Sequence, residues 1–116
     1  LMDEIYLNLY RKVEFAVSKG IQKDRIIVDP GIGFGKNRAH NFEILKRLEE
    51  FKTIGCRVLL GLSRKSMLNM PEADNFTKDI YTTALNTLAL EHGADILRVH
   101  NVKMHRCLLD ILCEKE

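Results

Sequence analysis

Three short apolar runs, each followed by a stretch whose apolar residues recur at helical spacing, constrain the fold of this chain most. The runs are Ile26–Val28, Val58–Leu60 and Ile96–His100. The first is rich in β-branched residues, which is typical of a strand covered on both faces of a sheet. Sequential parallel strands need crossover helices between them, so the order of the elements predicts a parallel α/β sheet.

Four helices are predicted around these strands. The first ends at Gly20 in a left-handed cap, and Asn41 is expected to cap the second, which Gly55 ends. A polar loop over residues 71–75 precedes the third helix, which ends at Gly93. In chain order, the apolar positions expected to face the core are Tyr6, Leu9, Tyr10, Val13, Ala16 and Val17; Phe42, Leu45, Leu48 and Phe51; Ile80, Ala84, Leu85, Leu88 and Ala89; and Met104, Cys107, Leu108, Ile111 and Leu112. Three residues of the last helix are expected on the surface: Lys103, His105 and Arg106.

Length and charge limit the possible functions of the chain. The 116 residues make one domain at most and fall short of the roughly 250 that an eight-stranded α/β barrel needs. Lys and Arg number 18 against 16 Asp and Glu, so we expect a small-molecule partner and no nucleic acid. The three cysteines form no C-x-x-C pair and are expected to be reduced. Without a membrane span or a leader, the protein is expected to be soluble and cytoplasmic, with no membrane partner.

Polar side chains follow each predicted strand. Asp29 comes directly after the first strand and precedes the glycine-rich loop over residues 31–35, and residues 63–65 (Ser-Arg-Lys) follow the second. Arg98 and His100 close the third, two residues apart, so we expect both side chains on the same side of that strand. Ligands of parallel sheets bind at the carboxyl ends of the strands. The clusters suit a ligand with a hydrogen-bonding ring at one end and phosphates at the other.

Structural interpretations of the same residues remain open. Asp29 could simply end a strand and begin a turn, and Arg64 with Lys65 could be a solvated basic pair. His100 could be a structural histidine. The loop is not a nucleotide-binding loop, because its glycines lack the G-x-G-x-x-G spacing and Asn37 stands where a P-loop needs Ser or Thr.

The segments "DPGIGFGK", "GLSRKS" and "RVHNV", in this order, closely resemble the C-terminal part of the dihydropteroate synthase family. The likeness runs from about Asp24 to Val102. It implies a (β/α)8 TIM barrel of which residues 1–116 are a C-terminal fragment of a pterin-binding domain, with three parallel strands and four helices. Three strands cannot close a barrel, and their unpaired edges predict a homo-oligomer.

The resemblance also implies a function in folate biosynthesis. Enzymes of this family condense p-aminobenzoate with 6-hydroxymethyl-7,8-dihydropterin diphosphate, giving 7,8-dihydropteroate and diphosphate, and are sulfonamide targets. Mg²⁺ is expected mainly on the N-terminal part of the barrel, which this chain lacks, and on the substrate phosphates, with no metal ligand in this fragment. The implied pterin-binding residues are Asp29, Gly61, Lys65 and Arg98. Phe34, Ser63 and Arg64 are expected to border the p-aminobenzoate pocket, and Arg98 with His100 to bind the diphosphate.

Some features depart from the family pattern. Asn101 stands where the family usually has Asp, which removes a charge beside the anion site, and we expect a minor effect. Residues 68–83 lack the usual small-residue helix start. Without the N-terminal half, the fragment alone is not expected to catalyse. The alternatives are a pterin-binding methyltransferase domain of the same fold, or an inactive fragment or paralogue; the cations of "SRKS" and "RVH" favour the synthase, because a diphosphate leaving group needs them.

Overall fold

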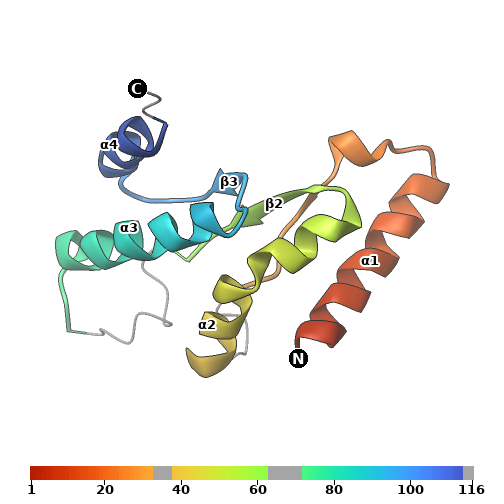
Figure 1. The fold of residues 1–116 in the computed structure, drawn as a ribbon, viewed down its shortest axis with the longest axis horizontal. Helices are drawn as coiled ribbons and strands as arrows, with labels where there is room; N and C mark the ends of the chain where they lie inside the picture. The colour runs from red at the N-terminus through yellow and green to blue at the C-terminus, as the bar shows by residue number, and fades with distance from the viewer. Residues whose placement is uncertain (33–37, 63–71, 114–116) are drawn as a thin grey trace.

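The computed structural model describes residues 1–32, 38–62 and 72–113 and shows strands alternating with helices (Figure 1). The elements are α1 (Met2–Ser18), the 3-10 helix η1 (Lys23–Arg25), β1 (Ile27–Val28), α2 (Arg38–Lys46), the 3-10 helix η2 (Leu48–Ile54), β2 (Arg57–Leu60), α3 (Asn75–Glu91), β3 (Ile96–Leu97) and α4 (Val102–Leu112). α1 and α4 lie at opposite ends of the molecule (Figure 1). Within the described ranges, no helix is both long and apolar enough to cross a bilayer.

The described strands form one sheet in the order β1-β2-β3. β1 and β2 are parallel, with Val28 opposite Val58, and β2 and β3 are parallel, with Leu60 opposite Leu97. The predicted parallel α/β sheet is therefore confirmed. Each strand pairs with the next one along the chain, which places the three carboxyl ends side by side at one edge of the sheet.

The two faces of the sheet differ in burial. Val28, Val58 and Leu60 are 4%, 0% and 1% exposed and belong to a core that also contains Leu48 and other residues of α2 and η2. Ile27 points to the opposite face, because side chains alternate along a strand, and it is 50% exposed. The prediction that this run is covered on both faces is wrong for Ile27, which is half exposed.

The helix ends follow the predicted glycines. Gly20 has a φ of 97°, and its N–H donates to the Val17 carbonyl at 3.0 Å, which ends α1 in a left-handed cap as predicted. Gly55, with a φ of 98°, ends η2 in the same conformation. The prediction that Asn41 caps the second helix is wrong, because Asn41 lies inside α2 (Arg38–Lys46) with 1% exposure. Burial of its side chain has overridden a local capping preference.

α3 buries only part of the predicted face: Leu85, Leu88 and Ala89 pack in the core as predicted. Asp74 caps the helix by accepting a hydrogen bond from the Thr77 N–H at 2.7 Å, and this bond lowers the pKa of Asp74. Ala89 is buried as predicted, but Ile80 is 47% exposed and Ala84 is also exposed. The other buried residues of the helix are polar, namely Asp79, Thr82 and Asn86.

The third strand is shorter than predicted and α4 is differently oriented. β3 ends at Leu97, although the Arg98 N–H still donates to the Leu60 carbonyl at 2.9 Å. In α4, the surface prediction for His105 is wrong, since its exposure is 4%. Three predicted core positions of the helix are exposed instead: Cys107, Ile111 and Leu112. α4 packs on α3 with the side that carries the buried His105.

Asp95 fixes the start of β3 to its neighbours. Its carboxylate accepts a hydrogen bond from the Val58 N–H at 2.9 Å and pairs with the Lys52 ammonium, while its own N–H donates to the Val58 carbonyl at 2.9 Å. Burial acts to raise the pKa of Asp95, but the hydrogen bonds from Lys52 and Val58 outweigh it, so the pKa lies below its usual value. This arrangement sets the register of β3 on β2, which places Arg98 at the carboxyl ends of the strands.

Candidate functional site at the carboxyl ends of the strands

Three of the residues predicted from the sequence lie at the same edge of the sheet. Asp29 directly follows β1, Gly61 directly follows β2 and Arg98 directly follows β3. The three strands are parallel neighbours, so these positions come together because of the topology alone.

Asp29 is exposed and is held by the turn that follows it. Its Oδ1 accepts a hydrogen bond from the Gly31 N–H at 2.8 Å, and Gly31 has a φ of 78°, which favours glycine. The turn role that the sequence left open is therefore present. It does not exclude a ligand, because a carboxylate offers about four acceptor sites.

Gly61 and Arg98 lie in direct contact. A Cβ built on Gly61 would stand 2.6 Å from Arg98 Nη2 and 2.9 Å from its Cζ, so a side chain there would force the guanidinium to move. The guanidinium thus occupies the space that a side chain at residue 61 would take. Gly61 is buried whereas Arg98 is exposed, so the pair presents a cation at the open edge of the site.

His100 lies in a bend after β3 and is exposed. The prediction that Arg98 and His100 share one side of a strand is wrong, because β3 ends at Leu97 and the alternation of side chains ends with it. His100 instead lies immediately before Asn101, whose Oδ1 caps α4 by accepting from the Met104 N–H at 2.9 Å. Asn caps a helix about as well as Asp, so the departure from the family pattern leaves this helix start intact.

The N-terminus of α4 adds to the positive potential near Arg98. The first N–H groups of a helix carry partial positive charge and favour anions. α4 begins at Val102, directly after the segment that carries Arg98 and His100. This end of the candidate site is therefore suited to a phosphate-bearing group.

Four of the predicted site residues lie outside the described residues: Phe34, Ser63, Arg64 and Lys65. Their assigned roles stay predictions. Among the residues that the structure describes, no group of three or more His, Cys, Asp and Glu side chains could hold a metal ion. The expectation that Mg²⁺ binds mainly outside this fragment stays a prediction.

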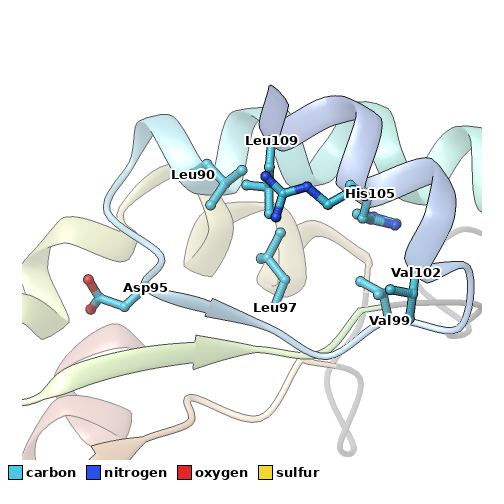
Figure 2. Close-up of a pocket in the computed structure, with 8 residues that line it drawn as sticks. Leu90, Asp95, Leu97, Val99, Val102, His105 and Leu109 are labelled. Carbon is cyan, nitrogen blue, oxygen red and sulfur yellow. The ribbon is translucent and has the colours of Figure 1, made fainter. Parts of the chain in front are cut away.

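A separate pocket of about 270 Å³ lies between β3, the end of α3 and α4 (Figure 2). Its lining is mostly apolar: Leu90, Asp95, Leu97, Val99, Val102, His105, Arg106 and Leu109. It contains none of Asp29, Gly61, Arg98 and His100, and the sequence did not point to it.

Sequence reasoning also missed a buried polar cluster between α3 and α4. Asn86 Nδ2 lies 2.9 Å from His105 Nε2, and His105 Nδ1 lies 2.9 Å from the Asn101 carbonyl. Asn101 Nδ2 is 3.5 Å from Asp79 Oδ2, at the long limit of a hydrogen bond. The available signal was the spacing of Asp79, Thr82 and Asn86, which places three polar side chains on one side of a helix.

A parallel strand-helix arc with an acid and a cation at the carboxyl ends of its strands is the arrangement found in part of a (β/α)8 barrel. Residues 1–100 match the family of pterin binding enzymes, and the chain belongs to this family. The dihydropteroate synthase of Clostridium beijerinckii is 38% identical over 106 residues, which are 88% of this chain and 39% of that protein.

Solved structures agree with this assignment. The dihydropteroate synthase of Stenotrophomonas maltophilia with active-site-bound imidazole superposes with a TM-score of 0.90 and 32% identity, over 97% of this chain and 43% of that one. The Xanthomonas albilineans enzyme with 4-aminobenzoic acid gives 0.88 and 33%, over 96% and 41%. The chain therefore spans less than half of each relative, and the predicted fold, part of a TIM barrel, is confirmed.

Proposed function

We propose that the chain is the C-terminal, substrate-binding part of a dihydropteroate synthase, a transferase of folate biosynthesis that joins p-aminobenzoate to 6-hydroxymethyl-7,8-dihydropterin diphosphate. The observation that carries the proposal is the arrangement of Asp29, Gly61 and Arg98 at one edge of the sheet in a member of the pterin-binding family. The Arg98 cation and the N-terminus of α4 favour a diphosphate leaving group over the transfer of a methyl group.

Each end of the site has a distinct task in this proposal. Asp29 accepts hydrogen bonds from the amino and ring N–H groups of the pterin, as a carboxylate does well. Gly61 lets the ring lie against the backbone while Arg98 covers it, and Lys65 contacts it from the same strand end. Phe34, Ser63 and Arg64 border the p-aminobenzoate pocket; these three and Lys65 enter by resemblance alone.

The chemical step needs no protein nucleophile. The amine of p-aminobenzoate attacks the methylene carbon of the pterin substrate, the carbon–oxygen bond breaks, and diphosphate leaves with the bonding pair. The nitrogen then releases one proton to solvent, which gives the secondary amine of the product. Arg98, His100 and the first N–H groups of α4 stabilise the charge that develops on the leaving group. Mg²⁺ would neutralise further phosphate charge, and it is expected on the substrate phosphates and on parts of the barrel beyond this chain, with no described residue assigned to it.

Asp29→Asn and His100→Ala are expected to separate the two ends of the site in a complete barrel that carries this chain. Asn presents donors to ring N–H groups, so a charge-assisted hydrogen bond worth about 1.5–3 kcal/mol is lost and affinity for a pterin falls about tenfold or more, with or without the diphosphate. His100→Ala should weaken only the diphosphate-bearing ligand. Calorimetry with the bare pterin and with its diphosphate, on both variants, measures the contrast.

The melting temperatures of both variants serve as the control. A structural histidine would lower the melting temperature and weaken both ligands equally, because lost packing does not discriminate between ligands. That result would remove His100 from the site, and unchanged pterin binding in Asp29→Asn would remove Asp29.

We also propose that the 116-residue chain alone binds no substrate pair productively and associates with itself. β1 and β3 each have an unpaired edge, and large apolar side chains of α3 and α4 are exposed, such as Phe76 at 63% and Ile111 at 73%. Sedimentation velocity should therefore show species larger than the monomer. A strictly monomeric chain at high concentration would contradict this. We place the protein in the cytoplasm, with no nucleic acid or membrane partner.

A further inference from the structure

The buried polar cluster between α3 and α4 reaches the anion-binding end of the proposed site. Asn86 is 1% exposed and His105 is 4% exposed, and the two side chains meet at 2.9 Å. His105 lies on α4, and its other ring nitrogen is 2.9 Å from the backbone carbonyl of Asn101 (Figure 2 shows the imidazole beside Val102). His100, which we assign to the diphosphate, directly precedes Asn101.

The hydrogen bonds define which tautomer the neutral His105 ring adopts. A backbone carbonyl can only accept, so His105 Nδ1 carries the proton and donates to Asn101. In the neutral ring Nε2 is then an acceptor, and the Asn86 amide group must donate to it. Asn86 Oδ1 is left buried, with no hydrogen-bond partner in the described part of the chain.

The imidazole supplies the shorter of two bonds that hold the Asn101 carbonyl. The backbone N–H of His105 also points to this carbonyl, as in an ordinary helical turn, but at 3.3 Å. The Nδ1 bond is 2.9 Å long. Asn101 is further held through its side chain, which accepts from the Met104 N–H at 2.9 Å. Asn101 is therefore held both at its backbone carbonyl and at its side chain. It is the residue at which the chain turns from the proposed anion-binding segment into α4.

We propose that His105 is a positioning residue for the anion-binding end of the site, acting through Asn101 on His100 and on the first N–H groups of α4. The proposal rests on the proposed function, since it assigns a task to His105 only if a diphosphate binds there. The bond from Nδ1 to Asn101 carries this task. The bond from Nε2 to Asn86 holds the ring in the orientation that makes it possible. Small displacements of groups that contact a reacting phosphate have large effects on the reaction rate, so the residues that position those groups matter as well.

Two isosteric substitutions separate the two bonds. In His105→Asn, the amide nitrogen takes the place of Nδ1 and can still donate to Asn101, whereas the contact with Asn86 is lost. In His105→Gln, the longer side chain brings an amide to the place of Nε2 and can still meet Asn86, whereas the bond to Asn101 is lost. Both variants retain a polar side chain in the same buried space.

The test measures, by calorimetry, the affinity of the complete barrel for inorganic diphosphate, for the pterin diphosphate and for the bare pterin. The melting temperature of each variant is measured as well. His105→Gln should weaken both diphosphate ligands about three- to tenfold, the loss expected for one hydrogen bond. His105→Asn should stay within about twofold of the unaltered protein. Affinity for the bare pterin should not change in either variant. Leu90→Ala, which removes apolar packing beside α4 and no hydrogen bond, is the matched control and should lower the melting temperature alone.

Three results would overturn the proposal. Equal affinities of the two His105 variants for diphosphate would show that the bond to Asn101 does not matter. Parallel losses for the bare pterin and the diphosphate ligands, following the melting temperature as in Leu90→Ala, would return His105 to a structural role. If the unaltered barrel bound the bare pterin but bound its diphosphate no better, both the proposed anion-binding end and the role of His105 would be wrong. If only the His105 variants departed from the expected affinities, the proposed function would stand and the role of His105 alone would be wrong.

Discussion

Gly61→Ala is expected to weaken binding of the pterin diphosphate about ten- to a hundredfold while changing the free energy of unfolding by less than about 1 kcal/mol. The new Cβ would stand 2.6 Å from Arg98 Nη2, so the guanidinium must leave its place over the backbone. The displaced atoms are the far end of a flexible side chain, and Gly61 does not have a positive φ, so the fold accepts the change. Calorimetry and thermal melting of the complete barrel measure both quantities.

Two further variants test whether Gly61 acts through Arg98. In Gly61→Ala combined with Arg98→Ala, the losses should not add, because the first change already removes the contribution of the second. Gly20→Ala is the opposite control: residue 20 has a φ of 97° and nothing within 4 Å of a built Cβ, so this change should cost stability without affecting the ligand. Fully additive losses in the double variant would contradict the coupling.

Phe51→Ala should lower the free energy of unfolding by about 3–5 kcal/mol, the usual cost of emptying a core position of this size. Phe51 is fully buried in η2, and its ring stacks on that of Tyr6 with centroids 6.5 Å apart. The contact joins α1 to the body of the chain, together with the hydrogen bond between Tyr6 Oη and Thr53 Oγ1 at 2.9 Å. Denaturant unfolding followed by circular dichroism gives the change.

Phe15→Ala provides the matched comparison. The same atoms are removed from a side chain that is 65% exposed on α1, so the loss should stay below about 1 kcal/mol. Similar losses for Phe15 and Phe51 would mean that the core does not lie where the structure places it.

The sequence predicted the order and type of the elements because hydrophobic periodicity and glycine stops are local signals. It did not predict burial correctly where burial depends on which other elements pack against a residue. Ile27 belongs to a run with the composition of a buried strand, but its side chain is half exposed in the described structure. On α3, the exposed Ile80 shows that the apolar residues of a helix need not face the described core, and the buried Asn86 shows that polar residues can.

The site was predictable to the extent that topology determines it. Asp29, Gly61 and Arg98 meet because each follows a parallel strand, which needs no knowledge of side-chain packing. His100 was misplaced because the strand ends at Leu97, and strand ends are set by hydrogen bonds with a neighbour distant in sequence. The spacing of Asp79, Thr82 and Asn86 indicated a polar side of α3, but it could not identify His105 as the partner of Asn86, because that contact joins two different helices.

The parallel order of the sheet also limits how copies of this chain could combine. Edge pairing that keeps the strands parallel joins β3 of one copy to β1 of the next, a head-to-tail contact that uses two different surfaces and repeats without limit unless it forms a ring. With three strands in each copy, two copies supply six strands and three supply nine, and neither number is the eight of a closed barrel. The self-association proposed above would therefore give species of several sizes unless a ring formed, whereas a complementary five-stranded piece would stop growth by completing the barrel.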